Sequence, residues 1–287
     1  MSTIRTCLQN AVKKLAEANV VTGGAENAAL DASLLLCHTL GIGRTELYLR
    51  DDDALDTVDV ATYDALIERR CLGEPVAYIT GTKEFWGLNF DVEKGVLIPR
   101  PDTETLIATV MAHVSEKQAS LSFVDVGVGS GTIILSLLHE FPNFKGEGVD
   151  ISDTALKITQ KNAEKFGIAE RLTLHKGEFL APIENTVDLI VSNPPYIEKD
   201  VISTLSVDVK GFEPMEALDG GADGLDCYRV IIPQACDKLN QGGLLIMEIG
   251  YDQAATVTAL FDTEKWQGMN VIKDLAGHSR VVLAQKK

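Results

Sequence analysis

The chain has 287 residues, of which 45% are hydrophobic and 24% are charged, a composition typical of a globular protein with a substantial core. Its formal net charge of −16 argues against a broad nucleic-acid-binding face, because such a face normally needs a basic surface. No stretch approaches the ~20 consecutive apolar residues of a membrane span, so we expect no association with a membrane.

The cysteines and histidines predict neither disulfides nor a metal site. There are five of each, both sets are dispersed along the chain, and no C-x-x-C pair occurs. This usage is typical of buried thiols in a reducing compartment. The N-terminus also lacks the continuous apolar run of a signal peptide, so we predict a cytoplasmic protein without a bound metal.

The first part of the chain carries helical patterns. Apolar residues recur at three- and four-residue steps over residues 4–15, as on one face of a helix. A second helix is predicted over residues 26–40, ended by Gly41, and a third over residues 59–71. We therefore predict a helical domain over residues 1–75.

Residues 76–96 differ in pattern from the helical part. Aromatic residues and glycines alternate there with polar residues, which predicts a β-hairpin connector. The stretch LIPRPDTE at residues 97–104 follows, and its prolines suit the entrance of a helix that begins near Thr105.

From residue 121 onward, short apolar segments alternate with helical ones, which predicts an α/β fold over residues 97–287. The expected structure is a mostly parallel sheet with helices on both faces. In such sheets ligands bind outside the carboxyl ends of the strands. The predicted strands are residues 122–127, 146–151, 172–177, 187–193, 242–250, 271–277 and 280–285. Helical segments are predicted near residues 131–140, 153–166, 223–239 and 252–260.

The first of these strands runs into a glycine-rich loop, DVGVGSG, at residues 125–131. Glycine at every second position lets the backbone turn tightly and approach a ligand closely. Nineteen residues beyond Gly131, the second strand ends at Asp150, where a carboxylate can accept hydrogen bonds from both hydroxyls of a ribose.

A dinucleotide is the competing ligand for this loop. Its G-x-G-x-x-G fingerprint has a different spacing, and an acid at Asp125 would repel phosphates but could hold an ammonium group directly or through water. The pattern therefore favours S-adenosylmethionine over a dinucleotide; a third interpretation is that the glycines serve only helix–sheet packing. After the third strand, Glu178 can accept from an adenine amino group and Phe179 can lie against the ring, although Phe179 could equally belong to the core.

The fourth strand ends on Asn193, Pro194, Pro195 and Tyr196, a motif suited to methylating a planar nitrogen. The lone pair of an amide or aromatic amine is delocalised, so two acceptors must hold its N–H hydrogens and leave one lobe facing the methyl group. The Asn193 side-chain oxygen and the Pro194 carbonyl can be those acceptors, and Tyr196 can stack on the flat substrate group. The alternative is a strand simply ended by two prolines.

This motif occurs both in adenine-N6 methyltransferases of nucleic acids and in protein glutamine methyltransferases, so it leaves the substrate open. The remainder of the chain resembles the protein-(glutamine-N5) methyltransferases that modify peptide chain release factors, the PrmC/HemK family. The resemblance rests on residues 70–104, on FEPMEAL at residues 212–218, on GGADGLDCYRVII at residues 220–232 and on GGLLIMEIG at residues 242–250. It spans essentially the whole chain.

The resemblance implies a Rossmann-like class I S-adenosylmethionine-dependent methyltransferase that methylates the glutamine of the Gly-Gly-Gln loop in class I release factors, with the helical domain gripping the protein substrate. We also expect a monomer that binds no nucleic acid directly. The residues expected to hold the glutamine are Asn193, Pro194, Pro195 and Tyr196. Of these, Asn193, Pro194 and Tyr196 are expected to be catalytic. The residues expected to contact the cofactor are Asp125, Gly127, Val128, Gly129, Ser130, Gly131, Asp150, Glu178, Phe179 and Asn193. The residues expected to have only supporting roles are Arg100, Glu104 and Glu213.

Four residues depart from the pattern of the family. Val128 and Ser130 stand where the loop often has threonine, which is tolerable because the backbone makes the contacts. Lys210 stands near a common arginine, and Glu178 replaces a more common aspartate, which would lengthen an adenine contact.

Three other functions stay open at this point. The first is a glutamine methyltransferase of a large-subunit ribosomal protein. In that group the connector has a different sequence after the proline, and PRPDTE here favours the release-factor enzymes. An adenine methyltransferase would need a basic target-recognition region. A non-enzymatic S-adenosylmethionine-binding protein would have no use for the oriented acceptors at residues 193–196.

Overall fold

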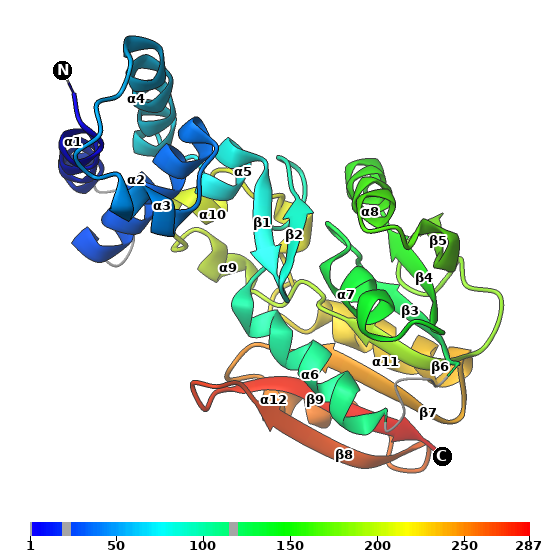
Figure 1. The fold of residues 1–287 in the computed structure, drawn as a ribbon. Coiled ribbons are helices and arrows are strands. Elements are labelled where there is room, and N and C mark those ends of the chain that lie inside the picture. Colours follow the sequence, from blue (N-terminus) through cyan, green and yellow to red (C-terminus); the bar gives the residue numbers. More distant parts are fainter. Residues whose placement is uncertain (1, 19–23, 115–119) are drawn as a thin grey trace. The chain divides into compact units, whose positions relative to one another are not determined.

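The computed structural model describes residues 2–18, 24–114 and 120–287. By their contacts these divide into two compact units. The helical unit contains residues 1–82 and 204–213, and the sheet unit contains residues 83–203 and 214–287. Figure 1 shows the elements in chain order. Within the described residues every helix is too short or too polar to span a bilayer.

The helical unit is built from amphipathic helices that share one apolar core. Its helices are α1 (Ile4–Ala18), α2 (Gly24–Leu40), α3 (Arg44–Leu49), α4 (Thr57–Cys71), α5 (Val76–Thr80) and α10 (Val207–Lys210). Leu15 of α1, Leu35 of α2 and Ile67 of α4 are almost fully buried against one another's helices. The Asp56 side chain caps α4 by accepting the backbone N–H groups of Val58 and Asp59, as the start of a helix requires.

The predicted hairpin over residues 76–96 is shorter than expected. Residues 76–80 form α5, which enters after Pro75 and ends at Gly81 in the left-handed conformation (φ 74°). Only β1 (Thr82–Phe85) and β2 (Leu88–Asp91) pair. The two residues between them, Trp86 and Gly87, have φ values of 53° and 72°, as the favoured two-residue hairpin turn demands. Pro75 and Gly81 therefore mark a helical turn that the aromatic alternation concealed.

Residues 204–213 fold with the helical unit, although the sequence pattern predicts them within the sheet unit. Arg70 of α4 is 4% exposed and contacts Asp31 of α2 at 2.8 Å and Asp208 of α10 at 3.8 Å. Next to it, a Cβ atom on Gly73 would lie 2.9 Å from Val207 Cγ1. A buried cation shared by two carboxylates thus attaches this distant segment to α2 and α4.

The sheet unit confirms the predicted α/β fold. Its large sheet has seven strands among the described residues, in the order β5-β4-β3-β6-β7-β9-β8, and only β9 runs against the others. The strands are β3 (Ser122–Val126), β4 (Lys145–Asp150), β5 (Leu172–Lys176), β6 (Val187–Ser192), β7 (Leu239–Glu248), β8 (Trp266–Lys273) and β9 (Ser279–Lys286). The α-helices are α6 (Glu104–His113), α7 (Thr132–Glu140), α8 (Asp153–Lys165), α9 (Lys199–Ile202), α11 (Asp226–Lys238) and α12 (Ala254–Thr258). The single 3-10 turns are η1 (Pro101–Thr103), η2 (Ala169–Arg171) and η3 (Met215–Ala217).

The predicted strand at residues 271–277 has the wrong bounds at both ends, since β8 already begins at Trp266. β8 stops at Lys273, because the Asp274 side chain accepts the backbone N–H groups of Ala276 and His278 and closes a turn there. The following strand then returns along β8 as β9.

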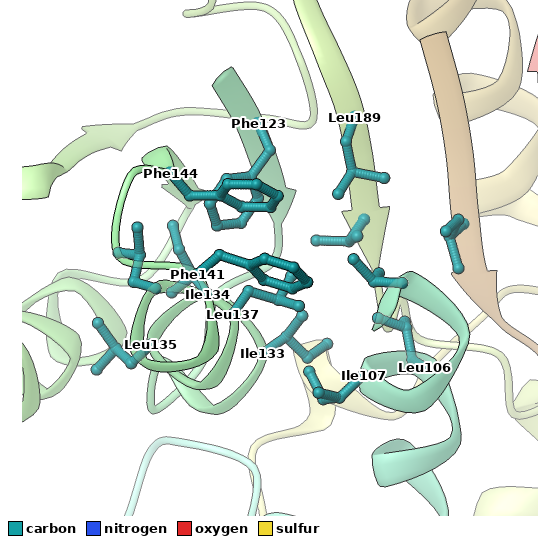
Figure 2. Packing of buried hydrophobic residues seen from close by; sticks show 14 of the residues in the cluster. Leu106, Ile107, Phe123, Ile133, Ile134, Leu135, Leu137, Phe141, Phe144 and Leu189 are labelled. Carbon is teal, nitrogen blue, oxygen red and sulfur yellow. The ribbon is translucent and has the colours of Figure 1, made fainter. Parts of the chain in front are cut away.

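Successive side chains along each strand pack alternately into two cores, one on each face of the sheet. Phe123 and Leu189 face the core formed with α6, α7 and α8, whereas Val124 and Ile190 face the core formed with α11 and α12. Figure 2 shows the first of these cores, with Phe123 and Leu189 directed at side chains of α6 and α7. A parallel sheet covered on both faces leaves its strand ends as the place where polar residues can meet.

We expect Arg70→Met to lower the unfolding free energy of the helical unit by about 3–5 kcal/mol, because it leaves the partly buried Asp31 carboxylate without its cation. Arg69→Met is the matched control, since Arg69 is 44% exposed in its pair with Glu74 and its loss should cost less than about 1 kcal/mol. Urea unfolding followed by circular dichroism measures both. Equal losses would contradict the assignment of the stabilising contact to Arg70.

Candidate active site

A cavity of about 680 Å³ lies at the carboxyl ends of the parallel strands in the sheet unit. Cavities of this size are typical of sites for small molecules and cofactors. Four segments predicted from the sequence line it together, namely residues 126–130 after β3, 149–152 after β4, 177–179 after β5 and 192–195 after β6. Residues of the 95–103 stretch, of α7, α8 and α11 and of the 214–217 segment also line it.

The glycine-rich loop is held in its shape by Asp150. Gly127, Gly129 and Gly131 have φ values of 80°, 56° and 84°, in the left-handed region that favours glycine. The N–H of Gly129 donates to Asp150 Oδ2 at 3.0 Å, and the N–H of Ser152 donates to Oδ1 at 2.9 Å. Asp150 is thereby fixed at the cavity wall with lone pairs left for further donors. This chemistry suits a ligand that carries two neighbouring hydroxyl groups.

Asp125 and Gly131 lie behind this wall and do not line the cavity. Asp125 is fully buried; its Oδ2 accepts the Ile134 N–H at 3.1 Å, and its Oδ1 has no partner among the described residues. Burial raises the pKa of this carboxyl well above its ordinary value. In this structure Asp125 supports the start of α7, and the ammonium contact considered from the sequence remains a prediction.

Glu178 and Phe179 both line the cavity. Phe179 has a φ of 49°, which is uncommon for a residue with a side chain and costs backbone energy. The N–H of the next residue, Leu180, donates to Gln234 Oε1 at 2.9 Å and so anchors the turn to α11. The sequence left Phe179 open between core and site, and the structure places it at the cavity.

Asn193, Pro194 and Pro195 line the cavity as well. Asn193 Nδ2 donates to the Thr103 Oγ1 at 3.2 Å, and this leaves the side-chain oxygen of Asn193 as its remaining acceptor. The Ser192 hydroxyl donates to the Val126 carbonyl at 2.7 Å and joins the ends of β6 and β3. The motif is thus held next to the glycine-rich loop.

Tyr196 is not part of the cavity lining. Its hydroxyl donates to Glu248 Oε1 at 3.2 Å, and its backbone carbonyl accepts from Gln253 Nε2 at 3.0 Å. Burial raises the pKa of Tyr196 above its ordinary value, so the hydroxyl stays protonated. The predicted stacking on the substrate remains a prediction, because in this geometry the residue ties the motif to β7.

Glu248 is a residue of this region that the sequence analysis missed. It is 1% exposed, at the end of β7, and burial raises its pKa from 4.5 to about 7, against the opposing hydrogen bond from the Thr103 side chain and the charge of Arg280. The Tyr228 hydroxyl donates to its backbone carbonyl at 2.9 Å. The signal in the sequence was one acid within the apolar run LLIMEIG.

The residues expected to have supporting roles lie in different parts of the structure. Arg100 lines the cavity. Glu104 accepts the Trp86 N–H through Oε1 at 3.1 Å and so holds the hairpin turn against α6. Glu213 and Lys210 belong to the helical unit, where Glu213 is buried. Across the described ranges, no group of three or more His, Cys, Asp or Glu residues is arranged to hold a metal ion.

Two family models match the chain. The PrmC N-terminal domain matches residues 6–81, and the methyltransferase small domain matches residues 102–208. A release factor glutamine methyltransferase from Caulobacter vibrioides is 42% identical over 264 residues, which cover 92% of this chain and 91% of the relative. Another from Moorella thermoacetica is 40% identical over 287 residues and covers 99% of both chains. The chain belongs to the release factor glutamine methyltransferase family.

A solved structure supports the fold of this family member. The ribosomal protein L11 methylase from Lactobacillus delbrueckii subsp. bulgaricus superposes with a TM-score of 0.51 at 19% identity, covering 71% of this chain and 90% of that one. The family assignment also confirms the resemblance inferred from residues 70–104, 212–218, 220–232 and 242–250.

In this family member, Glu248 should make stability depend on pH. Its proton binds more tightly in the folded protein than in the unfolded chain, so its stabilising contribution is present below about pH 4.5 and is lost as the pH rises through about 7. Between about pH 5 and 8 we expect the wild type to lose about 2–3 kcal/mol of unfolding free energy that Glu248→Gln does not lose. Denaturant titrations at both pH values measure this difference. Glu184→Gln, at an exposed site, is the control, and its unfolding free energy should change with pH as that of the wild type does. An equal change of unfolding free energy with pH in all three proteins would refute the role of Glu248.

Proposed function

We propose that this chain transfers a methyl group from S-adenosylmethionine to the side-chain amide nitrogen of the glutamine in the Gly-Gly-Gln loop of class I peptide chain release factors. The observation that carries the proposal is one cavity lined both by the glycine-rich loop with Asp150 and by Asn193 and Pro194. Family membership supports the same substrate, since relatives at about 40% identity over nearly the full length are release factor glutamine methyltransferases.

The lining residues fit the proposed cofactor. Asp150 would accept from the ribose hydroxyls, Glu178 from the adenine amino group, and Phe179 would lie beside the ring, while the loop at residues 127–130 leaves room for close backbone approach. S-adenosylmethionine supplies an electrophilic methyl group when bound and leaves as S-adenosylhomocysteine. The about 680 Å³ of the cavity is enough for a ligand of that class.

The proposed role of residues 193–196 is to orient the glutamine amide. The Asn193 side-chain oxygen and the Pro194 carbonyl would accept its two N–H hydrogens, and the remaining lobe of the nitrogen would then face the methyl donor. No general base of matched pKa is required, because the nitrogen becomes acidic as it is methylated and then loses its proton. Pro195 would shape the wall, and Tyr196 would support the motif from behind through Glu248.

The proposal assigns the other parts of the chain as well. Residues 1–75 would bind the protein substrate, and residues 97–287 would catalyse the methyl transfer. Residues 76–96 would connect these two domains. Since release factors work on ribosomes, we expect the enzyme to act in the cytoplasm. We also expect it to act as a monomer without binding nucleic acid, in line with its net charge of −16.

The direct test incubates the purified protein with methyl-labelled S-adenosylmethionine and either an intact class I release factor or the same factor with Gln→Ala in its loop. We expect label in the intact factor alone. A large-subunit ribosomal protein and duplex DNA serve as the competing substrates. Equal labelling of both release factors, or preferential labelling of the ribosomal protein or the DNA, would overturn the proposal.

Asn193→Ala should lower kcat about 100-fold or more, because it removes an acceptor that orients the reacting amide. The Kd for S-adenosylmethionine should rise by less than about tenfold, as expected for the loss of one ordinary hydrogen bond. Asn240→Ala is the matched control, since Asn240 Nδ2 donates to Asp188 at 2.8 Å away from the cavity. Isothermal titration and single-turnover kinetics separate the two quantities; a variant that fails only because it unfolds would contradict the orienting role.

A further inference from the structure

A chain of side-chain contacts joins the proposed glutamine-binding residue to a buried carboxylate. Asn193 Nδ2 contacts the Thr103 Oγ1 at 3.2 Å, and the Thr103 side chain hydrogen bonds to Glu248. Thr103 is 4% exposed and Glu248 is 1% exposed, so water does not compete freely for these groups. The three residues come from the segment after β6, from η1 and from β7, which are far apart in the sequence.

The ionised carboxylate determines the direction of these hydrogen bonds. An ionised Glu248 can only accept, and a threonine hydroxyl has one hydrogen to give, so Thr103 must donate to Glu248. The Thr103 oxygen is then an acceptor, and only the NH2 group of the Asn193 amide can satisfy it. With the amide reversed, two oxygens without a hydrogen between them would face each other. The Asn193 carbonyl oxygen is therefore left as the acceptor for another donor.

The same carboxylate holds the other end of the motif and is surrounded by few charges. The Tyr196 hydroxyl donates to Glu248 Oε1 at 3.2 Å, and Tyr228 contacts the backbone carbonyl of Glu248. The compensating cation is Arg280 of β9, whose Nη2 lies 3.1 Å from Asp102 and 3.2 Å from Asp274. Glu248 Oε2 has no hydrogen-bond partner among the described residues. Burial raises the Glu248 pKa to about 7, despite Arg280, so the carboxylate form prevails only above that pH.

We propose that Thr103, held by ionised Glu248, is a positioning residue that keeps the Asn193 amide turned with its oxygen available to the substrate amide. The inference rests on the proposed function, because it explains how an asparagine that can bind in two orientations presents an acceptor instead of a donor. It gives the threonine of the PRPDTE stretch a specific task. It also links turnover to the ionisation of a residue outside the cavity lining.

Substitution of the hydroxyl tests the inference. Thr103→Val keeps the shape and removes the hydroxyl, and we expect it to lower kcat about 10- to 100-fold, the size of effect that a misplaced reacting group produces. The KM for the release factor and the Kd for S-adenosylmethionine should change far less than kcat. Thr103→Ser restores the hydroxyl and should recover kcat to within about threefold of wild type. Thr109→Val is the matched control, because Thr109 is equally buried and its hydroxyl donates to the Thr105 carbonyl in α6; its kcat should match that of the wild type.

A double-mutant cycle shows whether Thr103 acts through Asn193. If it does, adding Thr103→Val to Asn193→Ala lowers kcat no further than Asn193→Ala alone. Losses that multiply in the double variant would overturn the inference, because they would show that the two residues act independently.

The pH profile tests the part assigned to Glu248. The wild-type kcat should rise as the pH increases through about 7, where Glu248 ionises and compels Thr103 to donate. Glu248→Gln can donate to Thr103 and release its hydroxyl, so this variant should have a lower kcat above that pH and no rise there. A Glu248→Gln enzyme with the wild-type kcat and profile would overturn the inference, even if the Thr103 variants failed to fold.

The outcomes separate this inference from the proposed function. A wild-type protein that leaves the release factor unlabelled overturns the proposed function, and the inference with it. A wild-type protein that labels the glutamine, together with a folded Thr103→Val variant of unchanged kcat, overturns the inference alone.

Discussion

The parallel pairing of β3 with both β4 and β6 is the constraint on which the site depends. Val126 at the end of β3 lies level with Val149 of β4 and Ser192 of β6. Because the three strands run in the same direction and stop at the same level, the residues that follow them meet at one edge of the sheet. The glycine-rich loop, Asp150 and Asn193 therefore line one cavity, although they are separated by more than sixty residues from first to last. The two apolar cores hold this register, since a slip of one residue would turn every strand side chain to the wrong face.

Buried polar groups complete the arrangement behind the cavity. Removing a carboxylate from water is costly unless hydrogen bonds or a cation compensate it. Asp125 is compensated by the Ile134 N–H at the start of α7, and Glu248 by Thr103, Tyr196 and Arg280. In both cases the hydrogen bonds connect the carboxylate to a segment next to the cavity. Burying these carboxylates lowers stability, but their hydrogen bonds fix the positions of residues that line the cavity, which apolar packing alone could not do.

Much of the fold followed from pattern alone. Short apolar segments with helical segments between them predicted the parallel sheet, and the family assignment confirms the resemblance seen in the connector and in residues 212–218, 220–232 and 242–250. The errors occurred where a few residues overrode a pattern. Pro75 and Gly81 enclose a helical turn within an apparent hairpin, and Asp274 ends β8 early through its own hydrogen bonds. Residues 204–213 were misplaced because the attachment of Asp208 to Arg70 joins positions that are distant in the sequence.

The sequence by itself determined which residues are suited to bind a methyl donor and to orient a planar nitrogen, because glycine conformations, side-chain acceptors and proline geometry are local properties. Only the tertiary structure decided which of them share the cavity. It set Asp125 and Tyr196 behind the wall, Phe179 on it, and Glu248 beneath the motif. The physical reason is that burial, hydrogen-bond partner and pKa are properties of a residue's surroundings, and those surroundings are assembled from strands and turns that only the folded sheet brings together.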